Sequence, residues 1–137
     1  MKKYLIVLVA GFALILFLNA CAKEDTQTTN QATVVGTWSG TGQYGTIPGG
    51  SPTYAFTLTF KVDGTVNIIG DNNTGPDTGT GTWVMVQDSV QAIYTYTAGS
   101  ALYKLSGKFS TGSNTMAGTI GLTSATTGVG IFTVTRQ

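Results

Sequence analysis

The sequence predicts an all-β domain, specifically an antiparallel up-and-down barrel of about eight strands, with a small β-sandwich as the alternative. Short runs rich in Thr, Val, Ile and aromatic residues alternate with Gly, Asn, Asp and Pro, a spacing typical of β-sandwiches and β-barrels. No helix-length segment with a period of 3.6 residues follows the first 20 residues. An open sheet would expose two edges and a hydrophobic face, and closure into a barrel removes both.

Each expected strand is a run of this kind between turn residues. The short link from Val62 to Thr65 contains Asp-Gly, which favours antiparallel neighbours. Alternate residues from Tyr54 to Phe60 are aromatic or Leu, the pattern of a sheet with one buried face. The expected strands are residues 33–40, 53–61, 64–69, 79–86, 89–97, 101–110, 114–122 and 128–136.

The N-terminus has the layout of a secretory signal. Lys2 and Lys3 form a short positive head, and an unbroken apolar run extends from Tyr4 to Leu18 before Cys21, the single cysteine. A membrane-spanning helix needs roughly 20 apolar residues. A permanent transmembrane segment is therefore the weaker interpretation.

Residues Leu18-Asn19-Ala20-Cys21 resemble the lipobox of bacterial lipoproteins. That resemblance implies cleavage before Cys21 and conversion of its thiol to a lipid thioether. The alternative is an ordinary signal peptide with a stray Cys. Lipidation explains why a thiol with no disulfide partner is kept in an oxidising compartment, and several acyl chains on Cys21 would anchor the protein stably.

The charged residues Lys23, Glu24 and Asp25 come directly after Cys21 and Ala22. They resemble the export tag of Bacteroidota surface lipoproteins, in which a lysine and two acids direct the protein to the outer leaflet. The resemblance implies a lipid-anchored protein of the outer membrane, exposed at the cell surface. The alternative is that these residues are only the solvated start of a linker.

The chain divides into three parts. Residues 1–20 are the expected signal peptide, and residues 21–32 the lipidated Cys and a flexible tether, because residues 22–32 have no hydrophobic periodicity. Residues 33–137 form the expected barrel domain. This length suffices for one modest domain and not for two.

Charge excludes one class of partner. Four positive and four negative side chains leave the expected domain with a formal charge of zero and without a basic cluster, so we expect no nucleic-acid binding. We expect the membrane to be contacted only through the lipid anchor. The charged residues are Lys61, Lys104, Lys108 and Arg136, and Asp63, Asp71, Asp77 and Asp88.

Gly36-Thr37-Trp38 in the first expected strand, with Arg136 in the last, resembles the calycin arrangement of lipocalins, avidins and fatty-acid-binding proteins. The resemblance implies that Trp38 plugs one end of the barrel and that the Arg136 guanidinium covers its ring, within about 6 Å. Both residues are then structural. Biotin binding is not expected, because avidin pockets use several tryptophans and this chain has two.

Enzymatic activity is not expected. The chain has no His, and its one Cys is the expected lipidation site, which removes the commonest bases, nucleophiles and metal ligands. We expect no cofactor and no metal. The segment from Gly70 to Gly81 carries Asp71, Asn72, Asn73 and Asp77, which offer the oxygen ligands that calcium prefers. It lacks EF-hand spacing and is expected to be a solvated turn.

Two functional classes remain open. In the first, the barrel mouth binds an unidentified small apolar or glycan ligand on stacking tyrosines. In the second, a solid barrel contacts an envelope protein through its loops and outer face, because an eight-stranded barrel is just wide enough for either arrangement. The expected stacking residues are Tyr44, Tyr54, Tyr94, Tyr96 and Tyr103.

Overall fold

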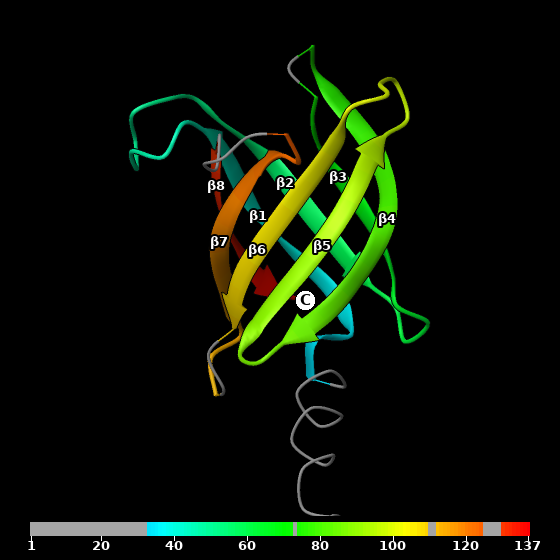
Figure 1. Cartoon of the computed structure of the whole chain (residues 1–137). Helices are drawn as coiled ribbons and strands as arrows, with labels where there is room; N and C mark the ends of the chain where they lie inside the picture. The colour runs from blue at the N-terminus through cyan, green and yellow to red at the C-terminus, as the bar shows by residue number, and fades with distance from the viewer. Residues whose placement is uncertain (1–32, 73, 110–111, 125–129) are drawn as a thin grey trace, which may run out of the picture.

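The structure, a computed structural model, describes residues 33–72, 74–109, 112–124 and 130–137. Here each strand pairs with the next along the chain, and the first pairs with the last to close a barrel (Figure 1). The expected antiparallel up-and-down barrel is confirmed and the β-sandwich alternative is wrong. The strands are β1 (Gly36–Tyr44), β2 (Thr53–Phe60), β3 (Thr65–Asp71), β4 (Pro76–Val86), β5 (Ser89–Tyr96), β6 (Leu102–Phe109), β7 (Thr115–Leu122) and β8 (Gly130–Arg136).

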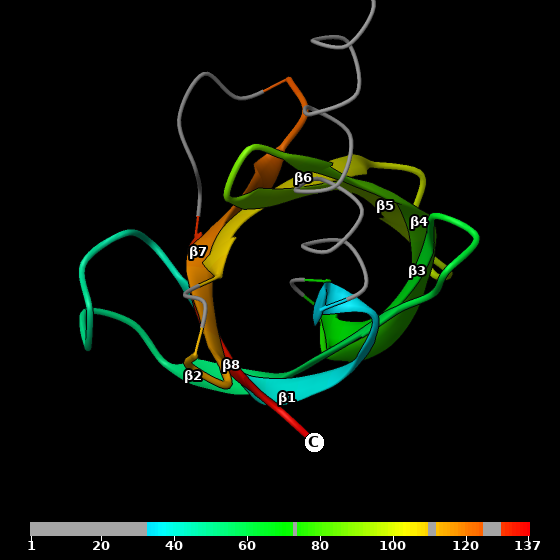
Figure 2. The same ribbon diagram turned by 90° about the horizontal axis from the view of Figure 1, so that it is seen from below.

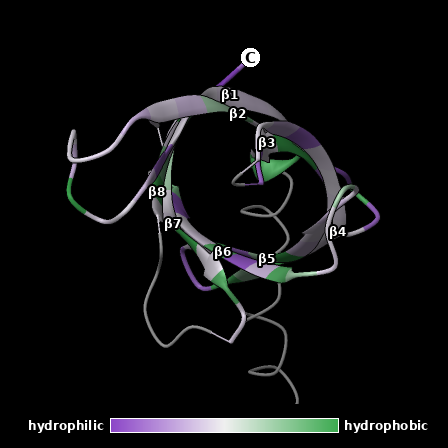
Figure 3. Cartoon of the chain, turned by 90° about the horizontal axis from the view of Figure 1, so that it is seen from above, coloured by the Kyte–Doolittle hydropathy of each residue, from purple (hydrophilic) through white to green (hydrophobic). Residues whose placement is uncertain are grey.

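Closure joins residues that lie almost a whole domain apart in the sequence. The register of β1 and β8 places Trp38 opposite Arg136 and Tyr44 opposite Gly130. The ring of strands is seen along the barrel axis from the two ends in Figures 2 and 3. In the part of the chain that is described, no helix is long and apolar enough to cross a membrane.

The segment from Gly70 to Gly81 differs from the expectation of one solvated turn. The Asn72 side-chain oxygen accepts hydrogen bonds from the backbone N–H and hydroxyl of Thr74, at 3.0 and 2.5 Å, which builds a tight local turn. Pairing of β3 with β4 therefore extends to Asp71 and Pro76, and Pro76 is tolerated as the first residue of its strand. Most of this segment is thus strand.

The barrel interior is filled by the alternate side chains of the strands. Apolar and aromatic residues of every strand face inward, and most are less than 8% exposed, as the period of two in the sequence predicts. Bulky rings need space that glycines provide, since a Cβ on Gly107 would lie 2.8 Å from the Phe132 ring. The largest fully buried side chains are Trp38, Tyr94, Phe56, Phe60, Leu58, Ile68, Leu105 and Met116.

Several glycines, Gly81 and Gly118 among them, mark places where neighbouring strands approach each other closely. A Cβ on Gly81 of β4 would lie 2.0 Å from the carbonyl oxygen of Ile93 in β5, and one on Gly118 of β7 equally close to that of Ser106 in β6. Any side chain there would push the strands apart. Glycines at such positions let a sheet bend sharply enough to close.

Candidate functional site

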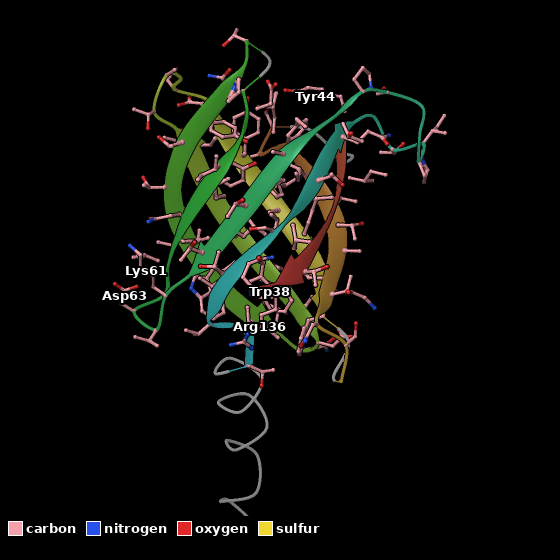
Figure 4. All side chains as sticks on the ribbon, turned by 180° about the vertical axis from the view of Figure 1, so that it is seen from behind. Trp38, Tyr44, Lys61, Asp63 and Arg136 are labelled. Atoms are coloured by element: carbon pink, nitrogen blue, oxygen red, sulfur yellow. The ribbon has the colours of Figure 1, made fainter. Side chains whose placement is uncertain are left out.

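The two ends of the barrel carry different side chains. Figure 4 shows Trp38 and Arg136 at the lower end and Tyr44 at the upper end. We call these the tryptophan end and the tyrosine end. The sequence predicts a structural pair at the tryptophan end and stacking residues for a ligand at the tyrosine end.

At the tryptophan end, the indole of Trp38 is fully buried. The guanidinium carbon of Arg136 lies 5.8 Å from the Trp38 ring centroid, inside the expected limit of about 6 Å for a cation–π contact. The same guanidinium donates hydrogen bonds to the carbonyl oxygens of Thr33 and Val35. These contacts join the segment that precedes β1 to the end of β8. Their role is therefore structural.

At the tyrosine end, the five candidate tyrosines gather into one group, named here the tyrosine cluster. Tyr94 and Tyr103 stack with ring centroids 5.4 Å apart and planes 19° apart, and Tyr96 meets both rings edge-on. Tyr44 and Tyr54 form a second pair at 5.1 Å. Tyr94 and Tyr96 are buried, whereas the other three are half-buried, so only part of the cluster can meet a ligand directly.

Two glycines make room for the tyrosine cluster. A Cβ on Gly70 would lie 2.4 Å from the Tyr96 hydroxyl oxygen, and a Cβ on Gly42 would lie 2.4 Å from the Tyr54 ring. Both positions therefore require glycine for the rings to occupy the barrel end. The sequence reasoning missed them, because the glycine and the ring that it accommodates are on different strands.

Asp71 is a further residue of the tyrosine end that the sequence reasoning assigned only to a turn. The Tyr44 hydroxyl reaches across β2 and donates hydrogen bonds to the Asp71 carboxylate at 2.8 Å and to its carbonyl oxygen at 3.2 Å. The sequence did hold a signal for this contact, namely an acidic residue at the end of a strand that was expected to lie near the tyrosines. The contact places one carboxylate beside the pair of Tyr44 and Tyr54.

Three phenols of the tyrosine cluster have raised pKa values. Burial, the nearby Asp71 carboxylate and Tyr103 raise the pKa of Tyr54 to about 12. Burial is also the main cause that raises the pKa values of Tyr94 and Tyr96, both well above the ordinary value for a phenol. All three hydroxyls are therefore neutral hydrogen-bonding groups at physiological pH.

The hydroxyl of Tyr94 is buried and has no hydrogen-bond partner among the described residues. It lies close enough to Tyr96 for the two phenols to affect each other's pKa, yet no hydrogen bond of ordinary geometry joins them. An unpaired buried hydroxyl costs stability. Unpaired groups of this kind are often explained by function, or by a water or ion.

Two pockets lie on the outer wall of the barrel and not at the tyrosine end. A groove of about 600 Å³ runs across β4 to β7, where outward-facing Val84, Ile93, Lys104 and Thr119 help to line it. A smaller hollow of about 270 Å³ lies over β2 to β4. No tyrosine lines either pocket, so the outer groove is a separate candidate surface.

The acidic residues near the β3–β4 turn serve the local structure. The Asp77 carboxylate accepts hydrogen bonds from the Asn72 amide at 3.0 Å and from the Ala98 backbone N–H at 2.9 Å, which ties this turn to the β5–β6 turn. Across the ranges that the structure covers, no group of three or more His, Cys, Asp or Glu side chains could hold a metal ion.

The expected lipidation site Cys21 and the expected export tag of Lys23, Glu24 and Asp25 lie outside the described residues. Comparison of the chain with known protein families, curated proteins and solved structures found no match.

Proposed function

We propose that this protein is a lipid-anchored, non-catalytic binding module of the outer membrane, exposed at the cell surface, and that it takes a small apolar or glycan ligand at the tyrosine end. The location is supported by the resemblance of Leu18-Asn19-Ala20-Cys21 to a lipobox and of the residues that follow to an export tag. The absence of His from the sequence supports a role other than catalysis.

The main support for a ligand site is the tyrosine cluster. Five aromatic rings from four strands converge on one end of the barrel, and one of their hydroxyls, that of Tyr94, is buried without a partner. Rings with a polar tip suit ligands that are apolar on one face and hydroxylated at the edge. Convergent polar groups with perturbed pKa values are typical of binding sites.

The size of the ligand is limited by the packing of the interior. Phe56 and Phe132, below the cluster, are almost fully buried with ring centroids 5.6 Å apart. A ligand therefore sits at the end of the barrel and not deep within it. This favours a single ring, or the terminal sugar of a glycan, over a long acyl chain.

The test is native mass spectrometry of the full chain, extracted from its own membranes in mild detergent. We expect a retained small molecule that is lost from Tyr44→Ala and Tyr103→Ala, because both rings are half-buried at the tyrosine end. Val62→Ala is the matched control, since Val62 is 83% exposed in the β2–β3 turn at the other end. A molecule retained equally by all three variants would contradict the proposal, as would a chain that carries none.

A second candidate function is contact with an envelope protein through the outer groove. The specific observation is its volume of about 600 Å³ together with two apolar side chains, Val84 and Ile93, that are 55% and 52% exposed. Exposed apolar patches with polar surroundings mark interaction surfaces. If this candidate is correct, Ile93→Asp should abolish chemical cross-links to other envelope proteins while leaving any ligand at the tyrosine end in place.

A further inference from the structure

The described charges are divided between the two ends of the barrel. Lys61 and Arg136 lie at the tryptophan end (Figure 4), and Lys108 joins them there through its ion pair with Asp88, at 3.6 Å in the β4–β5 turn. Lys104, the remaining described cation, lies on the outer wall of β6 and lines the outer groove. Among the described residues, the tyrosine end therefore carries two acids, Asp71 and Asp77, whereas Lys104, which directly follows Tyr103, lies on the outer face of the same half of the barrel.

The two acids of the tyrosine end are placed differently. Asp77 accepts hydrogen bonds from the turns on either side of it. Asp71 instead faces the tyrosine cluster, where its carboxylate accepts the Tyr44 hydroxyl at 2.8 Å. Its charge also reaches Tyr54, because it is one of the causes that raise the pKa of that phenol.

Asp71 therefore lies beside two electron-rich rings. The centroids of Tyr44 and Tyr54 are 5.1 Å apart with planes inclined at 44°, so the two rings form an angled pair with a carboxylate at the edge. Aromatic faces attract cations within about 6 Å of the ring centroid, and organic ammonium groups are recognised in this way. The same charge repels carboxylate and phosphate ligands.

The unpaired Tyr94 hydroxyl provides an independent indication of a polar ligand. It is buried among the phenols that surround it and has no partner among the described residues. As a neutral phenol it can donate one hydrogen bond and accept another. A ligand oxygen, or a water that the ligand holds, would satisfy it.

We infer that the ligand of the tyrosine end is a small hydroxylated molecule that carries an organic ammonium group, such as an amino sugar with a free amine. Asp71 balances the charge of an ammonium group that lies beside the Tyr44 and Tyr54 pair, against the exposed part of the rings. A hydroxyl of the ligand pairs with Tyr94, directly or through water. This inference rests on the proposed function, and it adds the charge of the ligand.

The test uses the full chain in detergent micelles and two probes of the same shape, glucosamine and glucose. Isothermal titration calorimetry is carried out at about pH 6, where an amine with the basicity of an α-amino group is protonated. We expect glucosamine to bind about tenfold more tightly than glucose, as one favourable charge contact provides. We expect Asp71→Asn to remove that tenfold preference, so that the variant binds the two sugars with equal affinity.

The variants are chosen so that the fold is preserved. Asp71→Asn retains a side-chain oxygen that can accept the Tyr44 hydroxyl and removes only the charge. Asp88→Asn is the matched control, because it removes an equal charge at the tryptophan end and should leave both affinities unchanged.

The outcomes separate the inference from the proposed function. Equal affinity for glucosamine and glucose, or an equal loss of both in Asp71→Asn, overturns the ammonium inference and leaves a neutral ligand site standing. A glucosamine preference that is lost equally in Asp88→Asn also overturns it, because the effect is then one of net charge. If neither sugar binds, the inference fails, and the proposed function then depends on the molecule retained in native mass spectrometry.

Discussion

Trp38 and Arg136 are register partners across the closing strand pair, and the guanidinium of Arg136 covers the indole at 5.8 Å. The indole N–H donates to the carbonyl oxygen of Val34 at 2.8 Å, and a Phe109 ring meets the indole edge-on at 5.7 Å. Arg136 also holds the carbonyl oxygens of the segment that leads into β1. One side-chain pair thus seals the tryptophan end and joins the first strand to the last.

The first prediction concerns the stability of this end. Trp38→Ala should lower the free energy of unfolding by about 3–5 kcal/mol, because removal of the fully buried indole leaves a large cavity. Arg136→Ala should lower it by only about 1–2 kcal/mol, because the cation is partly hydrated and its carbonyl partners can bind water. Urea unfolding followed by circular dichroism measures both values. A larger loss for Arg136→Ala than for Trp38→Ala would show that closure depends on the hydrogen bonds and not on the indole.

The second prediction compares two Tyr→Phe substitutions that remove the same hydroxyl group and should change the free energy of unfolding in opposite directions. Tyr94→Phe should raise the free energy of unfolding by about 1 kcal/mol, because it removes a buried hydroxyl without a described partner. Tyr44→Phe should lower it by about 1.5 kcal/mol, because its hydroxyl donates to the charged Asp71 carboxylate. The same unfolding measurement, made on chains freed of ligand, compares the two. Destabilisation by Tyr94→Phe would mean that the hydroxyl has a partner such as a bound water.

The third prediction concerns alkaline pH. The pKa values of Tyr54, Tyr94 and Tyr96 are raised in the folded domain above the ordinary value of 10.0. Unfolded phenols therefore lose their protons first, so the stabilisation is complete below about pH 10 and is lost as the pH rises above it. For Tyr94 alone the loss is about 1.4 kcal/mol per pH unit.

Unfolding free energies measured between pH 8 and pH 11.5 test this sign. We expect a plateau followed by a decline above about pH 10, with a shallower decline in Tyr94→Phe than in the unsubstituted chain. A free energy of unfolding that rises above pH 10, or an identical slope in both proteins, would contradict the burial of these phenols.

The fourth prediction concerns the anchor. Cys21→Ser removes the only thiol of the chain, so it should abolish incorporation of radiolabelled palmitate and leave uncleaved precursor or soluble protein. Labelling is measured after immunoprecipitation from growing cells, with the unsubstituted chain alongside. Equal labelling of the two proteins would exclude lipidation at Cys21.

The fifth prediction concerns export to the cell surface. Replacing Lys23, Glu24 and Asp25 by Ala should remove the protein from the cell surface while leaving it bound to the membrane. Protease treatment of intact cells, compared with treatment of lysed cells, distinguishes the two locations. If the substituted protein remains as sensitive on intact cells as the original, these residues are only part of the linker.

The strand pattern could be predicted from the sequence because it is local. Alternation of apolar and polar residues has a period of two in any strand, and the eight expected segments overlap the eight observed strands. Ends were less predictable: β1 continues to Tyr44, where an end at Gly40 was expected, and β4 begins at Pro76. Such ends depend on pairing with a neighbouring strand, which no local pattern contains.

At the tyrosine end, too, some features follow from local sequence patterns and others depend on how the strands pair. Alternation and composition are properties of the chain, so they predict the buried face of the run from Tyr54 to Phe60 and the neutral charge of the domain. The folded barrel was needed to learn that five tyrosines meet at one end, that Gly42 and Gly70 make room for two of them, and that Asp71 accepts a hydrogen bond from the Tyr44 hydroxyl. These contacts join different strands across a closed barrel, and the register that sets them is fixed only when every strand has found its neighbour.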